Sequence, residues 1–436
     1  MGTLMDNIFK IKENGTDIKT EIMAGLTTFI TMAYIIIVNP AILEVAGIPK
    51  GPSVVATIIA AAFGTLLMGL YANRPFAIAP YMGENAFIAF TVVKVLGYTW
   101  EAAIGAVFLG GILFTVLTIS GLKAWMARAI PSSLKYSFAA GIGLFLTLIG
   151  LGKMGMVAVG IPDAPLHVGK INTKPVFIAI IGFIITAALI TKKIKGSILF
   201  GIIITSCLAF VLKIAPLPPK IVSVPPSISP ILFKMDLKAA LSWKFFAIIL
   251  VVFVMDFIDT VATLIGVSAR AGMLDNEGNL PDIQKAMLCD ALATVVGALV
   301  GTTTTGTFIE SAAGVEIGGR TGLTAVTTAL LFLLSLFFAP LFTSVPVVAY
   351  APVLVIVGLL MLEAITKINF NDYTETIPAF TVLVLMSFTF NIGIGMTAGF
   401  ALYPLFKIID ARAKEVPLGM WIFAVLSLLF FVFYPY

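Results

Sequence analysis

Gly301-Thr-Thr-Thr-Thr-Gly-Thr-Phe308 interrupts a strongly apolar chain, in which 60% of the residues are hydrophobic and 11% are charged. Threonine and glycine are poor helix formers, so this stretch favours extended backbone. A short apolar segment, 310–318, follows it directly and begins with Glu310. Non-helical backbone at membrane depth leaves amide and carbonyl groups unpaired unless protein or a water-filled cavity receives them. The stretch therefore predicts a broken membrane segment beside a polar cavity.

A second stretch of this kind, Arg74-Pro-Phe-Ala-Ile-Ala-Pro80, precedes another short segment at 84–97. Aligned on their acids, Tyr81-Met-Gly-Glu-Asn-Ala86 stands opposite Thr307-Phe-Ile-Glu-Ser-Ala312. Further along each half, residues 175–178 match residues 378–381 in the same way. Paired broken helices in corresponding positions mark the binding site of transporters built from inverted repeats. Chance similarity between apolar segments is the alternative explanation.

Apolar windows of 16 to 24 residues recur along the whole chain, and a helix of about 20 residues crosses a bilayer core of about 30 Å. Breaks at charged and Pro/Gly clusters give about fourteen segments, at 22–43, 53–71, 84–97, 101–120, 133–151, 175–191, 197–214, 245–268, 284–300, 310–318, 321–339, 347–364, 376–391 and 394–409. The fold class predicted is an all-α polytopic membrane protein with two repeats of seven segments. Because seven is odd, the second repeat must be inverted relative to the first.

The boundaries expected are a first repeat at 1–214, an extramembrane linker at 215–244, a second repeat at 245–409 and a hydrophobic tail at 410–436. The tail could span the membrane or lie in its interface. Most of the 27 basic residues fall on one side if the N-terminus is cytoplasmic, as the positive-inside rule expects, although the linker places several lysines on the other side. The net charge of +5 thus needs no nucleic-acid partner, and the localisation expected is the cell membrane.

Four acids inside predicted membrane segments, Glu84, Asp256, Asp259 and Glu310, are candidates for function. Glu84 and Glu310 begin the two short segments, where each could cap a helix but where an acid in a bilayer is functional by default. Asp256, Asp259 and Thr263 follow at spacings of three and four, which places them on one face of a helix. Two neighbouring carboxylates do not readily ionise together, so one of them could carry a coupling proton. A structural pair that holds backbone or a nearby arginine is the alternative.

No enzyme signature competes with a transporter. The sequence has no phosphate-binding loop and no Cys/His spacing typical of zinc, and its one histidine has no evident partners for a catalytic triad. Cys207 and Cys289 both lie in apolar segments and predict no disulfide. We therefore expect no enzyme activity and no cofactor, with a proton as the coupling ion. A channel would need a lined pore rather than two broken segments.

Several motifs resemble the AzgA-type purine permeases, a family similar in fold to the uracil and xanthine permeases. They are Asp256-Phe-Ile-Asp-Thr-Val-Ala-Thr-Leu-Ile-Gly266, Gly301-Thr-Thr-Thr-Thr305, Glu310-Ser-Ala-Ala-Gly314 and Gly318-Gly-Arg-Thr-Gly-Leu-Thr324, with Glu21-Ile-Met-Ala-Gly-Leu-Thr-Thr-Phe-Ile-Thr-Met-Ala-Tyr34 near the start. The resemblance implies a core domain of segments one to four and eight to eleven, and a gate domain of the other six. It also implies that Asp259 and Glu310 bind substrate, with Thr263 one turn on from Asp259 and with Phe308 and Ile309 beside Glu310.

Two departures from that family's pattern bear on substrate. Glu310-Ser311 replaces the Gln/Glu-Asn pair of the wider superfamily, which favours the purine branch over the xanthine and uracil branch. Glu84 stands between Gly83 and Asn85, where many relatives are expected to have a hydrophobic residue. A further acid in the site leaves the proton stoichiometry and the substrate preference open.

The function expected is proton-coupled uptake of hypoxanthine, guanine or adenine by alternating access. Carboxylates of Asp259 and Glu310, with Asp256 as a further proton carrier, would face a purine edge. Amides at Gly83–Asn85 and Ile309–Ser311 would face another edge, and Phe87 or Phe308 could cover the ring. An anion carrier of the sulfate-permease type and a xanthine or uracil permease are the alternatives. The partners expected are the nucleobase and the lipid bilayer, and a homodimer is a further possibility.

Overall fold

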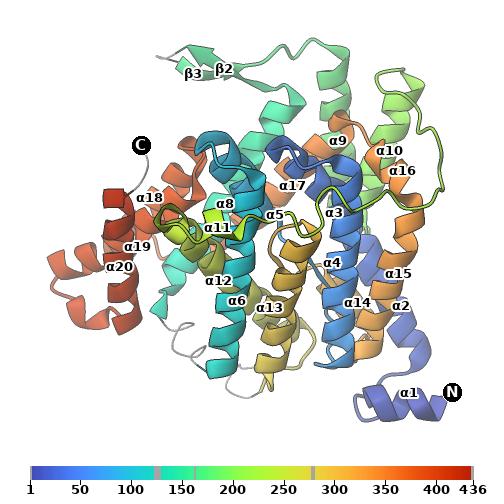
Figure 1. The fold of residues 1–436 in the computed structure, drawn as a ribbon, viewed down its shortest axis with the longest axis horizontal. Coiled ribbons are helices and arrows are strands. Elements are labelled where there is room, and N and C mark those ends of the chain that lie inside the picture. The colour runs from blue at the N-terminus through green and yellow to red at the C-terminus, as the bar shows by residue number, and fades with distance from the viewer. Residues whose placement is uncertain (1, 122–128, 162–163, 276–279, 434–436) are drawn as a thin grey trace.

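The computed structural model describes residues 2–121, 129–161, 164–275 and 280–433, shown as a ribbon in Figure 1. Up to the linker, the elements are α1 Gly2–Phe9, α2 Ile18–Met32, α3 Ile35–Leu43, η1 Glu44–Ala46, α4 Lys50–Leu70, β1 Ile78–Pro80, α5 Met82–Ala86, the π-helix η2 Phe87–Val95, α6 Trp100–Ser120, α8 Ser132–Met154, β2 Val157–Ile161, β3 Ala164–Val168, α9 Lys174–Thr191 and α10 Ser197–Val211.

After it, the elements are α11 Leu237–Ala240, η3 Trp243–Phe245, α12 Phe246–Arg270, α13 Ile283–Val300, β4 Thr305–Thr307, α14 Ser311–Ile317, α15 Gly322–Ser335, η4 Leu336–Phe338, α16 Ala339–Thr343, α17 Val347–Leu362, η5 Glu363–Lys367, α18 Tyr373–Phe388, α19 Ile392–Ile409, η6 Ala413–Glu415 and α20 Leu418–Phe433.

Ten helical stretches of the described residues are long and apolar enough to cross a membrane. They are Ile18–Ala46, Lys50–Leu70, Trp100–Ser120, Ser132–Met154, Lys174–Thr191, Trp243–Arg270, Ile283–Val300, Gly322–Thr343, Val347–Lys367 and Ile392–Ile409. Shorter apolar helices cover Ser197–Val211, Tyr373–Phe388 and Leu418–Leu429. The expectation of a helical, multi-pass membrane protein is confirmed.

The two stretches expected to be extended form strands that pair with each other. β1 and β4 run antiparallel, with Ile78 opposite Thr307 and Pro80 opposite Thr305, and every residue of both strands is buried. The pairing continues beyond the strands, because the Phe308 amide donates to the Ala77 carbonyl at 2.9 Å. Each stretch thus satisfies the backbone groups that the other leaves unpaired, which is how non-helical backbone is tolerated inside an apolar protein.

A short helix follows each strand. α5 spans only five residues before the chain continues as the π-helix η2, and α14 spans seven residues. Glu84 lies within α5, as expected. Glu310 instead occupies the position just before α14 and makes no capping hydrogen bond with its side chain.

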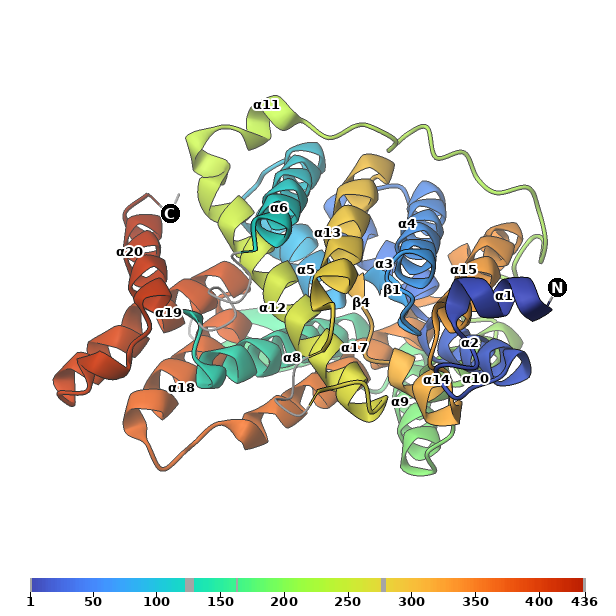
Figure 2. The ribbon, with the colours of Figure 1, turned by 90° about the horizontal axis from the view of Figure 1, so that it is seen from below.

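The helices form two groups. In the first group, α2, α4, α6, α13, α14 and α15 pack against one another, with α3 on α4 and α12 on α6. In the second group, α8 packs on α17 and α18, α9 packs on α10 and α17, and α18 packs on α19. Figure 2 shows α6, α13, α4 and α15 along one side of the molecule, and α18, α8, α17 and α9 along the other. The β1–β4 pair lies with the first group, where α4 covers β1 and α13 covers β4.

The chain between α10 and α11 passes from the second group across the outside of the first, as the long arc in Figure 2 shows. Its backbone is attached to helix ends of the first group. The Ser223 amide donates to the Phe337 carbonyl at 3.0 Å, and the Phe233 amide donates to the Leu299 carbonyl at 2.9 Å. The last helix, α20, packs on α19.

Candidate functional site

Five acids lie on the elements that form or surround the β1–β4 pair. Glu84 is in α5, Asp256 and Asp259 are in α12, Asp290 is in α13, and Glu310 directly precedes α14. Glu84, Asp256 and Asp290 are buried, whereas Asp259 and Glu310 are partly exposed. An acid deep in a membrane protein is costly, so a set of five marks this region as the candidate site.

Asp256 is tied to the framework of the first group. Its carboxylate lies 2.9 Å from the hydroxyl of Thr294 on α13, and that hydroxyl accepts a hydrogen bond from the Thr305 amide at 3.0 Å. The side chain is 1% exposed. Asp256 thus connects α12 with α13 and, through the Thr294 hydroxyl, with β4.

Asp259, one helical turn further along α12, lies beside Glu84. The two carboxyl groups are close enough to share a hydrogen bond once one of them carries a proton. Among the described residues, no donor side chain or neighbouring backbone amide bonds either Glu84 oxygen. Two adjacent carboxylates in a poorly solvated place repel each other, and one shared proton removes that repulsion. The Asp259–Glu84 pair is therefore the candidate place for a bound proton.

Glu310 has a partner that the sequence did not suggest. The Tyr34 hydroxyl, at the junction of α2 and α3, donates to the Glu310 carboxylate at 2.5 Å. The only sign of this role in the sequence is a polar hydroxyl within an aliphatic run, since a buried tyrosine hydroxyl usually needs a partner. Tyr34 thus holds one oxygen of the Glu310 carboxylate, and Glu310 makes no capping hydrogen bond to α14.

Asp290 was not among the predicted site residues, although the sequence contains a signal for it. It is an acid within the apolar segment predicted at 284–300, and the same argument that singled out Asp256 applies to it. Its carboxylate accepts the Thr307 amide at 2.9 Å and the Thr307 hydroxyl at 3.0 Å. Asp290 thereby fixes the end of β4, immediately before Phe308.

Three residues expected to face substrate through their amides make packing or structural contacts. Asn85 donates through its side chain to Asn39, and Asn39 donates to the hydroxyls of Thr57 and Thr302. The Ser311 hydroxyl accepts the Ala77 amide at 3.0 Å. Gly83 packs against α8, since a methyl group added there would approach the Ile142 side chain to 2.7 Å.

The remaining predicted residues differ in their contacts and in their exposure. Phe308 is buried and stacks parallel to Tyr81, with ring centroids 6.1 Å apart. Phe87 is buried at the start of η2 and faces Gly393 of α19. Thr263 is partly exposed on α12. Ile309 is 50% exposed, with its side chain near Gly266 of α12.

Basic side chains of the described residues do not pair with the five acids. In the part of the chain that the structure describes, none of the five acids is among the residues that form ion pairs with lysine or arginine. Over the same residues, no group of three or more His, Cys, Asp or Glu side chains could hold a metal ion. The arrangement suits a neutral ligand that donates N–H groups, or a proton.

One face of α12 leads from Asp259 toward the end of the helix at Arg270. Asp259 is partly exposed, Ala262 and Ile265 are exposed, and Arg270 at the end is exposed as well. By contrast, residues 251–258 are all buried. α12 packs against α6, α13, α14 and α19, so its exposed residues between Asp259 and Arg270 lie on the face that these helices leave uncovered.

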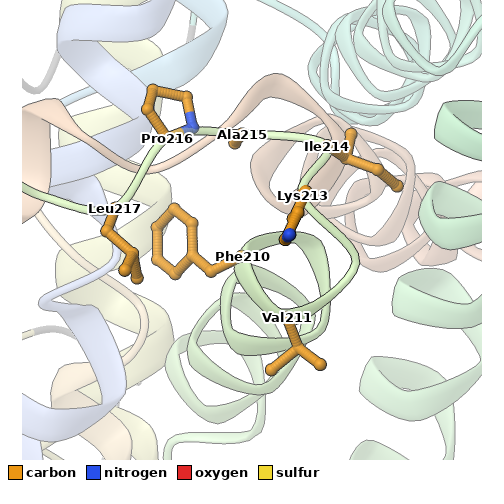
Figure 3. A pocket seen from close by; sticks show the side chains of 7 residues that line it. All are labelled: Phe210, Val211, Lys213, Ile214, Ala215, Pro216 and Leu217. Carbon is orange, nitrogen blue, oxygen red and sulfur yellow. The ribbon is translucent and has the colours of Figure 1, made fainter.

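A surface pocket elsewhere has no part in this site. It has a volume of about 440 Å³ and is formed by one continuous segment, 210–217, at the end of α10 in the second group. Figure 3 shows Phe210 and Leu217 on one side of it and Lys213 near its centre. No acid lines it.

Comparison with known proteins adds a family and a fold. A family model described as the Permease family matches residues 19–402. A protein of Methanocaldococcus jannaschii, named as a permease without a substrate, is 44% identical over 98% of this chain and 98% of its own. The adenine permease AdeP of Escherichia coli is 40% identical over 99% of this chain and 96% of its own. The guanine/hypoxanthine permease PbuO of Bacillus subtilis is 39% identical over 96% of this chain and 98% of its own.

Among solved structures, the transmembrane domain of the cyanobacterial bicarbonate transporter BicA superposes with a TM-score of 0.65. The match covers 87% of this chain and 97% of that domain, at 15% sequence identity. The resemblance to purine permeases read from the motifs is confirmed by the named relatives, which are transporters and not enzymes. The likeness to BicA shows the fold alone.

Proposed function

This chain belongs to the permease family whose model matches residues 19–402, and from that premise we propose that it takes up purine nucleobases across the cell membrane. The observation that carries the proposal is the Asp259–Glu84 pair, which lies beside the paired strands and, among the described residues, forms no ion pair with lysine or arginine. A purine with N–H donors on one edge suits such a site. The substrate class rests on the relatives named for adenine and for guanine and hypoxanthine.

The architecture behind this function is proposed to be an inverted repeat of fourteen segments. The ten long helical stretches, the helices Ser197–Val211 and Tyr373–Phe388, and the two short broken segments together make that number. The antiparallel pairing of β1 with β4 supports a twofold relation between the halves, since each strand occupies the corresponding place in its repeat. The first group of helices would be the core domain and the second group the gate domain, with the N-terminus in the cytoplasm.

Asp259 and Glu310 are the carboxylates that would accept N–H groups of the base. Asp259 is the partly exposed member of its pair, and it stands at the inner end of the exposed face of α12. Glu310 keeps one carboxylate oxygen bound to Tyr34 and is itself partly exposed. A charge-assisted hydrogen bond of this kind contributes about 1.5–3 kcal/mol. Phe308, held parallel to Tyr81, is the aromatic residue nearest to Glu310 in the chain.

Proton coupling would follow from the shared proton of Asp259 and Glu84. With the pair deprotonated, two negative charges must cross an apolar gate, which is costly when no cation accompanies them. Binding of a proton and a base leaves the loaded core nearly neutral and able to move. Such a difference between the loaded and the empty site is what alternating access requires of a symporter.

The test is uptake of radiolabelled adenine, guanine and hypoxanthine by transport-deficient cells, at external pH 8 and pH 6. We expect accumulation of at least one purine, faster at pH 6 because the proton is a co-substrate, and loss of accumulation with a protonophore. Xanthine, uracil and bicarbonate serve as the substrates of the alternatives. Uptake of bicarbonate without uptake of any purine would overturn the proposed substrate, and accumulation driven by sodium instead would overturn only the coupling.

A further inference from the structure

A two-stranded hairpin, β2 with β3, connects α8 to α9 in the second group of helices. Its register places Val157 opposite Val168, Ala158 opposite His167 and Val159 opposite Leu166. Figure 1 shows the hairpin at one end of the helix bundle, running across the direction of the helices. An isolated two-stranded hairpin is at best marginally stable in water, so this one is expected to rest on something.

The two faces of the hairpin differ in composition. Residues opposite each other in an antiparallel pair share a face, and successive residues alternate between faces. One face, here called the apolar hairpin face, consists of Val157, Val159, Ile161, Leu166 and Val168. The other carries Ala158, Gly160, Pro165 and His167.

Most of the apolar hairpin face is nevertheless left exposed by the part of the chain that the structure describes. Val159 is 86% exposed, Val168 is 70% exposed and Ile161 is 66% exposed. Contiguous exposed aliphatic side chains of this kind mark a contact with a partner or with a membrane rather than with water.

The short connections of the hairpin to α8 and α9 determine its depth relative to the membrane. Only Gly155 and Met156 separate α8 from β2, and residues 169–173 separate β3 from α9. Three Cα–Cα steps of at most about 3.6 Å join Met154 to Val157, so the base of the hairpin lies within about 11 Å of the end of α8. α9 has 18 residues, which is just enough to cross the hydrocarbon layer, with Lys174 at its first position. The hairpin therefore emerges at the membrane boundary.

The lipid-facing surface of α9 continues into the hairpin. Phe177 and Ile184 on α9 are 61% and 58% exposed, and Ile171, between α9 and the hairpin, is 52% exposed. Lys170 and Lys174 flank Ile171 and are exposed as well, as is common for cations at the level of the lipid headgroups. An amphipathic element next to a lipid-facing helix, with basic residues beside it, has the properties of an interfacial anchor.

We propose that the apolar hairpin face lies in the interfacial layer of the lipid bilayer, in the leaflet at the N-terminal end of α9. The occupant is lipid rather than a second copy of the chain, because five side chains fall well short of the roughly 20–30 residues that each partner contributes to a stable protein interface. The hairpin then fixes the ends of α8 and α9 at one depth in the membrane. Motion of the first helix group would occur against this fixed second group.

The experiment measures which solvent each face of the hairpin meets. Single cysteines replace Val159 or Val168 on the apolar face, and Ala158 or His167 on the opposite face as matched controls. The background is Cys207→Ala, because Cys207 is exposed, and Cys289 is buried and so shielded from labelling. Each full-length variant is spin-labelled and reconstituted in vesicles of phosphatidylcholine and phosphatidylglycerol. Collision rates with oxygen, which concentrates in lipid, and with a nickel chelate, which stays in water, are then compared.

We expect the ratio of oxygen to nickel accessibility to be several-fold higher at positions 159 and 168 than at positions 158 and 167. Equal, nickel-dominated accessibility on both faces would place the hairpin in water and overturn the proposal. Exclusion of both reagents at 159 and 168, with spin–spin coupling between copies, would overturn it in favour of a dimer contact. Gel-filtration profiles check that each variant is folded, and Ile161→Cys replaces a labelled site that fails this check.

Discussion

At the scale of single residues, Asp256 and Asp259 stand one turn apart on α12 but in different surroundings. Asp256 is buried against Thr294, whereas Asp259 is partly exposed beside Glu84. We predict that Asp259→Asn weakens purine binding by roughly 10- to 100-fold, the size of one charged hydrogen bond, with little change in thermal stability. Asp256→Asn should instead lower thermal stability and weaken binding less. Scintillation-proximity binding and thermal unfolding of the purified variants measure both, and equal binding losses would contradict the assignment.

Glu310 and Tyr34 form the other residue-scale prediction. Glu310→Gln keeps the shape of the side chain but removes its charge, so we expect loss of purine accumulation with normal insertion in the membrane. Tyr34→Phe removes only the hydroxyl that orients the carboxylate, and we expect uptake to fall by roughly tenfold. The double variant should be no worse than Glu310→Gln alone, because both changes act on one contact. Additive losses in the uptake assay would show that Tyr34 acts elsewhere.

At the scale of elements, β4 approaches Tyr81, the residue after β1, closely at Gly306. A methyl group at this position would overlap the Tyr81 ring, whose hydroxyl donates to the Thr307 carbonyl at 3.1 Å. We predict that Gly306→Ala costs about 1–3 kcal/mol of stability, as overpacking usually does, and reduces uptake because it displaces Phe308. The matched control is Gly152→Ala on α8, where an added methyl group meets no neighbouring atom within 4 Å. Unchanged unfolding temperature and uptake in Gly306→Ala would show that the strands tolerate separation.

How far these elements could be predicted depends on which interactions form them. The extended stretches before the two short helices were predictable, because glycine, threonine and proline disfavour a helix locally. Their pairing with each other was not, since it depends on how distant halves of the chain meet. The π-helix at Phe87–Val95 was not predictable either, because its apolar sequence suits an ordinary helix equally well. Lys407 was not predictable for the same reason. Its charge suggests a solvated position at the end of a helix, but its side chain is 1% exposed and lies 2.8 Å from the Glu375 carboxylate.

The candidate site was predictable to a similar extent. An acid in an apolar segment is conspicuous because burying it in a membrane is energetically unfavourable. Asp259 and Glu310 were predicted on that ground, and Asp290 could have been predicted in the same way. The side chains that hold those acids carry no such signal. Thr294 lies in α13 and Tyr34 lies between α2 and α3, and only the packed structure shows which acid each of them meets.

At the scale of the whole molecule, the two helix groups are joined by a contact at the end remote from Arg270. Tyr350 on α17 lies below two lysine ammonium groups, at 5.5 Å from Lys153 on α8 and at 5.9 Å from Lys50 on α4. Lys153 also donates to the Ala41 carbonyl of α3 at 3.3 Å. The contact thus links the second group to the first, whereas α12 is exposed toward the opposite end. The two groups are therefore held in contact at the Tyr350 end.

If the groups move against each other during transport, this contact must break in the opposite state. A cation–π contact contributes about 1 kcal/mol, and such a loss shifts a two-state equilibrium about fivefold. We therefore predict that Tyr350→Leu increases the population opened at this end by about that factor. Spin labels at Pro49→Cys and Gly152→Cys, in the Cys207→Ala background, report the separation across the contact by pulsed dipolar spectroscopy. Tyr373→Leu, at a tyrosine that is 74% exposed, is the matched control and should leave the distance distribution unchanged. A distribution in Tyr350→Leu that equals that of the parent would mean that the lysine–tyrosine contact does not hold this end closed, and that apolar packing between α8, α17 and the first group does so instead.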